Sequence, residues 1–248
     1  MCTIGAVRVD GGGYALFKNK DFARAIPDSL IVDDERVVVR GVADFASADG
    51  SLGSSTRWSG ASVGANRHGV MVADAHVRDR GATHQNYDEL AELALSAASV
   101  HEAIDVISTS VASRPAWWGN LVLADAQTLV AVEVRDAEIR VGVGDRVVVR
   151  TNHHLLFDDG FVEAGDGRSM DRLRIAVAEM SSVTTVEGIE RMLASHFATE
   201  PTGICNHSPD RTTVASYVLV HGASGSRALV RHGPACVAGA AVQLSLPS

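Results

Sequence analysis

Residues 2–21 read CTIGAVRVDGGGYALFKNKD and contain two runs of strand-forming residues on either side of the glycine-rich segment DGGG (10–13). Two such runs around a short glycine-rich turn are typical of a β-hairpin. The hairpin predicts that Cys2 lies at the open end of the first strand, directly after Met1. If Met1 is removed, Cys2 carries a thiol and a free α-amine on one residue. The simpler alternative is a small buried side chain at a strand end.

A four-residue loop at 10–13 determines which residues of the two strands face each other. Cys2 then lies opposite Asp21, with Cβ atoms about 5 Å apart on the same side of the hairpin. The carboxylate of Asp21 would accept a hydrogen bond from the amine of Cys2 and orient it. Lys18 is a cation that would favour the thiolate, although strict alternation places its side chain on the face opposite to Cys2.

An N-terminal cysteine can supply a nucleophile and its base together. A cysteine thiol has an ordinary pKa of about 8.5, so at neutral pH it needs a base or a cation to become an effective nucleophile. An α-amine has a pKa of about 7.7–8.0, which suits it to take the thiol proton and later protonate a leaving amine. One residue could therefore supply both a nucleophile and its base, and a small buried side chain remains the alternative for Cys2.

The rest of the chain alternates between strand-like and helix-like segments. Helical spacing occurs at 87–111, where Ser99 and Glu102 form a capping-box pattern, and at 169–197, where Ser169 is the expected N-cap. Strand-like runs precede, separate and follow these two regions. The order of sheet, helices, sheet, helices and sheet favours an α+β fold in one domain spanning residues 1–248, with Met1 removed in the mature form.

Composition excludes several classes of function. The net charge of −8 disfavours nonspecific attraction to nucleic acid or anionic membranes, so we expect a small-molecule partner. The N-terminus lacks the pattern of a signal peptide, and no stretch approaches the ~18 apolar residues of a membrane helix. We therefore expect a soluble cytoplasmic protein.

Ten histidines and three cysteines prompt the alternative of a metal site. The cysteines lack CxxC spacing and the histidines lack HExxH spacing, which are the usual patterns of zinc sites. The candidate pairs are His76 with His84, His153 with His154, and Cys205 with His207. None has a convincing ligand pattern, and we expect neither a metal nor another cofactor.

The first hairpin resembles the start of a known enzyme family. MCTIGAV (1–7), followed at matching spacing by FKNKD (17–21), is similar to the N-terminal-nucleophile amide hydrolases of the choloylglycine hydrolase and penicillin V acylase type. Further segments resemble the same family, in particular its acyl-CoA:6-aminopenicillanic acid acyltransferase-like branch (C45). These segments are NRHGVMVADAHV (66–77), WGNLVLADAQTLVAVEV (118–134), RTNHHL (150–155) and ICNHSPDRTTVAS (204–216).

The resemblance implies a four-layer αββα sandwich, with two antiparallel sheets between helical layers. It implies that Cys2 is the nucleophile and base, that Asp21 anchors the amine, and that Asn152 donates to the oxyanion. Lys18 would replace an arginine that contacts the nucleophile in relatives. The motif residues assigned to substrate binding or to the oxyanion region are Asn19, Asp74, His76, His153 and Arg211.

The resulting hypothesis is a cysteine amidohydrolase that cleaves a linear carbon–nitrogen amide bond of a small N-acyl substrate through a thioester. The closest alternative is an acyltransferase, in which an amine intercepts the same thioester. A third alternative is a non-catalytic binding protein on the same fold. A homo-oligomer is compatible with the resemblance.

Overall fold

The computed structural model describes residues 1–22, 29–40, 60–77, 88–114, 117–157, 167–197, 203–209, 211–223, 225–237, 239 and 241–246. Two seven-stranded antiparallel sheets dominate it. The first sheet has the order β10 (Val147–Arg150), β1 (Cys2–Val9), β2 (Gly13–Phe22), β12 (Arg211–Gly222), β13 (Gly225–His232) and β14 (Val242–Ser245), with β11 (His207–Ser208) paired to β12.

The second sheet is a meander, in which strands that follow one another in the sequence are also neighbours in space. Its order is β3 (Ser29–Val32), β4 (Arg36–Arg40), β5 (Ala61–Asn66), β6 (Met71–His76), β7 (Trp117–Ala124), β8 (Leu129–Asp136) and β9 (Glu138–Gly144). The strand-like runs of the sequence therefore form strands as predicted.

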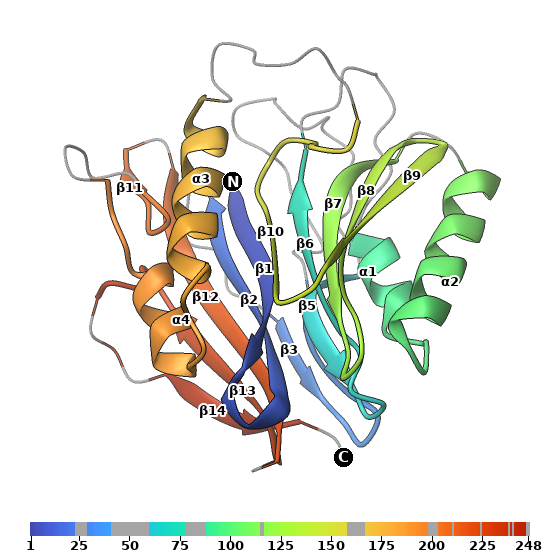
Figure 1. The fold of residues 1–248 in the computed structure, drawn as a ribbon, viewed down its shortest axis with the longest axis horizontal. Coiled ribbons are helices and arrows are strands. Elements are labelled where there is room, and N and C mark those ends of the chain that lie inside the picture. The colour runs from blue at the N-terminus through green and yellow to red at the C-terminus, as the bar shows by residue number, and fades with distance from the viewer. Residues whose placement is uncertain are drawn as a thin grey trace.

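Helices cover the outer face of each sheet, as Figure 1 shows. α1 (Asp88–Ala94) and α2 (Val100–Ser113) pack on the second sheet, and α3 (Gly167–Met180) and α4 (Val186–Leu193) pack on the first. The main apolar core lies between the sheets and includes Ile4, Leu16 and Val122. This arrangement is the predicted αββα sandwich. Within the described part of the chain, no helix combines the length and apolarity needed to cross a membrane.

The register of the first hairpin differs from the predicted one by one residue. A three-residue 3-10 turn (Asp10–Gly12) joins the strands, and Gly13 pairs with Val9 instead of belonging to the loop. Gly13 is extended and lies so close to β12 that a Cβ atom there would be 2.5 Å from the carbonyl oxygen of His221. Close packing against β12 therefore favours Gly13 as a strand residue.

This shift changes the neighbours of Cys2. Cys2 pairs with Lys20, and the Cys2 side chain lies on the face that carries Lys18, so the predicted placement of Lys18 on the opposite face is wrong. Asp21 pairs with Met1 instead: its N–H donates to the Met1 carbonyl oxygen at 2.7 Å, and the Met1 amine donates to the Asp21 carbonyl oxygen at 2.8 Å.

The two predicted helix starts have different outcomes. Ser99 is the N-cap of α2, where its hydroxyl accepts from the N–H of Glu102, and the Glu102 carboxylate accepts from the N–H of Ala98. Ser169, in contrast, lies inside α3, so its assignment as N-cap is wrong. Its hydroxyl accepts from the N–H of Asn152 at 2.9 Å, because this buried polar side chain faces the segment after β10.

Candidate active site around Cys2

Cys2 lies at the first position of β1, and its side chain is buried. Its N–H donates to Oδ1 of Asn152 at 2.7 Å. Asn152 follows β10, which pairs with β1, so the sheet brings together two residues that are far apart in the sequence. The nitrogen that would become the α-amine after loss of Met1 therefore already has a polar partner.

Several contacts hold the Asn152 amide in place. Its Nδ2 donates to the carbonyl oxygen of His76 at 2.6 Å, and its Oδ1 also accepts from Nη2 of Arg172 at 2.8 Å. Ser169 holds the Asn152 backbone and exchanges a hydrogen bond with the Thr151 hydroxyl at 3.0 Å. In this arrangement the Asn152 oxygen faces Cys2, while the Asn152 nitrogen is bound by a backbone carbonyl.

Arg172 is a fully buried arginine on α3 that reaches this group from the helical layer. Its Nη1 lies 3.4 Å from the Met1 sulfur, and its charge interacts with Asp21 and Cys2. Burial lowers the pKa of Arg172, and electrostatic interactions with Asp21 and Cys2 partly offset that effect. The guanidinium thus faces the position where the chain begins.

Asp21 lies on the helix-facing side of β2, beside Met1. Its Oδ1 accepts from the Thr213 hydroxyl at 2.7 Å, while its Oδ2 is buried without a hydrogen-bond partner among the described residues. Burial raises the pKa of Asp21, and the terminal amine and Arg172 act in the opposite direction. Asp21 is therefore near the amine, but through the pairing with Met1 and not by facing Cys2 across the hairpin.

Burial and the charged groups around Met1 change the pKa of its terminal amine. Burial lowers its pKa, electrostatic interactions with Cys2 and Asp21 raise it, and Arg211 and Arg172 lower it further. Burial and the two arginines have the larger combined effect, so the net pKa is below the ordinary value for an α-amine. An amine here is neutral at a lower pH than an exposed one.

A buried ion pair lies on the Cys2 side of the first sheet. The Lys18 ammonium donates to the Asp74 carboxylate on β6 and, at 2.7 Å, to the Ser62 hydroxyl on β5. Burial alone would lower the pKa of Lys18, but Asp74 and Cys2 together raise it. Burial and the adjacent Asp74 raise the pKa of Asp88, at the start of α1, well above its usual range. Lys18 therefore remains a cation between the sheets.

Asn19, His76 and His153 are also predicted site residues, and each has different contacts in the structure. Asn19 lies on the face opposite to the Cys2 side chain, and its amide donates to the carbonyl oxygens of Leu193 and Ile204, so the structure does not bring it to the Cys2 thiol. The carbonyl of His76 binds Asn152, and Nδ1 of His153 lies 2.8 Å from the Ser169 hydroxyl.

Arg211 and His84 are two further residues that the sequence singled out. Arg211 begins β12, and its charge acts on Asp21 and on the terminal amine. His84 lies outside the described residues.

Arg172, Ser169 and Thr213 also belong to this group of side chains, although the sequence motifs do not predict them there. The sequence does contain a signal for Ser169 and Arg172. Together with Ala176 they recur at helical spacing, on the buried face of α3. An arginine on such a face requires a polar partner inside the protein.

No model of a known protein family matches this sequence, and no curated protein sequence resembles it significantly. Solved structures do match. Penicillin V acylase from Agrobacterium tumefaciens has 14% identity and a TM-score of 0.60, covering 98% of this chain and 86% of that chain. An ortholog of N-acylethanolamine-hydrolyzing acid amidase from Caenorhabditis elegans has 12% identity and a TM-score of 0.55, covering 88% of this chain and 92% of that chain.

A mutant of conjugated bile acid hydrolase from Clostridium perfringens has 9% identity and a TM-score of 0.52, covering 99% of this chain and 97% of that chain. The TM-scores show a common fold, and at these low identities they show the fold alone, so the finer placement in the acyltransferase-like branch stays a prediction. The chain has the αββα fold of the N-terminal-nucleophile hydrolases, the fold that the motifs beginning at Cys2 imply.

Proposed function

We propose that this protein is a cysteine amidohydrolase that cleaves the linear amide bond of a small N-acyl compound, with Cys2 as its N-terminal residue after removal of Met1. The observation that carries the proposal is the hydrogen bond from the Cys2 nitrogen to Asn152, next to the buried charges of Arg172 and Asp21. The shared fold with an acid amidase, a penicillin acylase and a bile acid hydrolase supports the same class of reaction.

The reaction begins when the Cys2 amine takes the thiol proton and the sulfur attacks the carbonyl carbon of the substrate. The carbon–oxygen double bond opens to an oxyanion, and a donor positioned for that oxygen contributes about 10²–10³ in rate. The oxyanion then collapses and the carbon–nitrogen bond breaks. The leaving amine receives the proton held on the α-amine, and a thioester remains on Cys2.

Water completes the reaction. The α-amine takes one proton from the water as its oxygen attacks the thioester carbon. The sulfur–carbon bond breaks, the carboxylic acid leaves, and the thiol regains its proton. Lys18 contributes positive charge on the face of the first hairpin that also carries the Cys2 side chain, which favours the thiolate. Each step thus uses the nitrogen and sulfur of one residue.

Matched preparations with and without Met1 test this proposal. One sample retains Met1, and the other is treated with methionine aminopeptidase, with intact mass reporting the fraction processed. Each is incubated with N-acyl amino acids, penicillins, bile-salt conjugates, N-acylethanolamines and β-alanyl amines, and release of free amine is measured by a fluorogenic amine reagent. We expect turnover from the processed sample alone, and a thioester adduct on Cys2 by mass spectrometry.

Cys2→Ala is the decisive variant, and Thr109→Ala is its matched control because it truncates an exposed side chain on α2, which packs on the second sheet. Turnover should disappear in the first and persist in the second. Full turnover by Cys2→Ala, or by protein that retains Met1, contradicts the proposal. Addition of glycine as an acceptor distinguishes acyl transfer, because a transferase would form the N-acyl glycine in preference to the free acid.

A further inference from the structure

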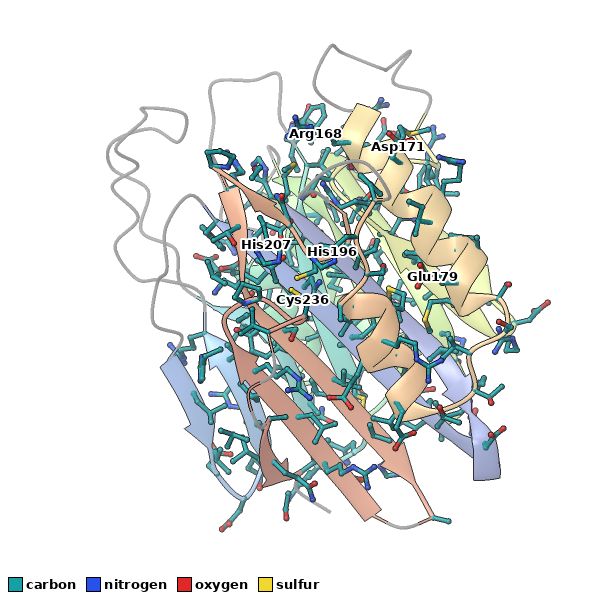
Figure 2. All side chains as sticks on the ribbon, turned by 90° about the vertical axis from the view of Figure 1, so that its left-hand side faces the viewer. Arg168, Asp171, Glu179, His196, His207 and Cys236 are labelled. Atoms are coloured by element: carbon teal, nitrogen blue, oxygen red, sulfur yellow. The ribbon has the colours of Figure 1, made fainter. Side chains whose placement is uncertain are left out.

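A second cluster of reactive side chains lies apart from Cys2, on the first sheet and its adjoining loops. His196, Cys205, His207 and Cys236 each direct one potential ligand atom toward the others, and these four atoms lie within 4.8 Å of one another. Nε2 of His207 is 3.6 Å from Sγ of Cys205 and 2.9 Å from Sγ of Cys236. Figure 2 shows His196, His207 and Cys236 side by side, on the side of the molecule that carries α3 and α4.

Backbone contacts hold the segments that carry these residues. A β-bridge pairs His196 with Gly203, and the N–H of Cys205 donates to the Ser195 carbonyl oxygen at 2.9 Å. Asn206 lies between Cys205 and His207, and its carbonyl oxygen accepts from the N–H of Thr213 on β12 at 2.8 Å, while its own N–H donates to the Thr213 hydroxyl at 2.8 Å. The ligand atoms therefore converge from three segments of the chain through fixed backbone geometry.

Two thiols and two imidazoles form the donor set of structural zinc sites. With Zn–S bonds of about 2.3 Å and Zn–N bonds of about 2.0–2.1 Å, the ligands of a tetrahedral site lie about 3.3–3.8 Å apart. The 3.6 Å distance between Cys205 Sγ and His207 Nε2 falls in that range. Cys236 Sγ lies closer to His207 Nε2, at 2.9 Å, and all four ligand atoms lie within 4.8 Å of one another, so side-chain rotation would have to adjust the set around an ion. Calcium and magnesium prefer oxygen ligands, which this set does not offer.

We propose that His196, Cys205, His207 and Cys236 bind one structural Zn²⁺ ion. Both cysteines are free thiols in the structure, so each can lose its proton to become a thiolate ligand. Four protein ligands complete a tetrahedron and leave no open position for a reacting water, which assigns the ion a structural role. Cys205 and His207 alone have no convincing ligand pattern in the sequence, whereas the fold adds His196 and Cys236 as the other two ligands.

The zinc site is connected to the Cys2 site through two hydrogen bonds. The N–H of Asn206 donates to the Thr213 hydroxyl at 2.8 Å, and that hydroxyl donates to Oδ1 of Asp21 at 2.7 Å. Asn206 lies between two zinc ligands, so the ion fixes the segment that orients Thr213. Zinc would thus hold Asp21 in position through Asn206 and Thr213.

Metal analysis of the full chain tests the proposal. Protein is incubated with Zn²⁺, dialysed, and measured by inductively coupled plasma mass spectrometry. We expect about one zinc ion per chain for the unaltered protein. The double variant Cys205→Ser/Cys236→Ser should lose the ion. Cys2→Ser is the matched control, because it removes the remaining cysteine and should keep the ion.

His196→Ala provides a second test if the double variant does not fold. Because His196 is exposed, its removal leaves no buried void. This variant should bind zinc more weakly than His101→Ala, a second exposed histidine. Cobalt(II) in place of zinc should give intense visible d–d bands together with sulfur-to-cobalt charge-transfer absorption. A chelator should lower the Tm of the unaltered protein and leave that of the double variant unchanged.

Three results would overturn the zinc site. One is zinc content that is equal in the unaltered protein and the double variant. Another is the absence of charge-transfer absorption with cobalt. The third is a disulfide between Cys205 and Cys236 in freshly isolated protein, seen as the loss of two hydrogens in the intact mass and of two titratable thiols. None of these measurements depends on amidase activity, so the zinc site and the proposed function can fail independently.

Discussion

The N–H of Cys2 donates a 2.7 Å hydrogen bond to Oδ1 of Asn152, and the same oxygen accepts from Arg172. The Asn152 side chain is therefore oriented as an acceptor toward the start of the chain. Its nitrogen, the group that an oxyanion would need, is bound to the carbonyl of His76. Two roles follow for Asn152, holding the Cys2 amine or donating to the oxyanion, and they predict different behaviour on substitution.

Asn152→Asp separates these two roles. Aspartate preserves the oxygen that accepts from Cys2 and Arg172, but it cannot donate a hydrogen bond and would place a negative charge beside an oxyanion. If Asn152 acts as the donor, kcat should fall about 10²–10³-fold with little change in KM. Steady-state kinetics on processed enzyme measure this, with Asn152→Ala as the variant that loses both contacts.

An Asn152→Asp enzyme with near-normal kcat, beside an Asn152→Ala enzyme that is strongly impaired, would instead assign Asn152 to holding the amine. Circular dichroism of both variants serves as the control for folding.

Arg172→Met should shift the acidic limb of the pH–rate profile. Burial together with Arg211 and Arg172 lowers the pKa of the terminal amine, and we expect the Cys2 amine to experience the same environment after loss of Met1. Removal of the Arg172 charge should raise the pKa of the amine. The neutral base then forms only at higher pH, and the acidic limb of kcat/KM moves to higher pH.

Arg172→Lys keeps the positive charge and should return the limb toward its original position. Arg174→Met is the matched control, because Arg174 is an exposed arginine on the same helix. A profile that is unmoved in Arg172→Met would show that this charge does not set the pKa of the base.

The fold was largely predictable from the sequence because its strands and helices follow clear apolar patterns. The hairpin register was not, because it depends on how closely Gly13 packs against β12, a strand some 200 residues later in the chain. A single-residue shift in pairing was enough to move Lys18 to the face of Cys2 and to pair Asp21 with Met1.

Among the residues of the candidate site, only those in recognisable sequence motifs could be predicted. Cys2, Asp21 and Asn152 belong to short segments that resemble a known family, and the structure places them close together. Arg172 has no motif, and its partners lie on other elements. Its contact with Asn152 depends on how α3 packs on the first sheet, which no local pattern encodes.

Lys18→Met should strongly destabilise the protein. Lys18 and Asp74 form a fully buried ion pair, and removal of one partner leaves an uncompensated charge, which costs about 3–5 kcal/mol. The free energy of unfolding from urea denaturation measures the loss. The double variant Lys18→Met/Asp74→Asn should recover part of it, because no unpaired charge remains at these two positions.

Arg67→Met provides the matched control for Lys18→Met. Arg67 pairs with Glu35 at 2.9 Å, but both side chains are about half exposed, so the expected loss is only about 0–1 kcal/mol. Equal losses from the two substitutions would contradict a special role for the buried pair.

Asp88→Asn should make the protein more stable than the unaltered chain at higher pH. Burial and the adjacent Asp74 raise the folded-state pKa of Asp88 well above that of an unfolded aspartate, so the folded chain retains a proton that the unfolded chain releases. This retained proton makes its full contribution to the free energy of unfolding below the ordinary aspartate pKa, about 3.9. The contribution falls as the pH rises toward the folded-state pKa, by at most about 1.4 kcal/mol per pH unit. Asparagine cannot ionise and avoids this fall, so the stability difference between variant and unaltered chain should grow between about pH 5 and about pH 8 in urea denaturation. The exposed Asp105 on α2 provides the control variant Asp105→Asn. A stability difference between Asp88→Asn and the unaltered chain that stays constant over this range would show that Asp88 is ionised in the folded protein throughout it.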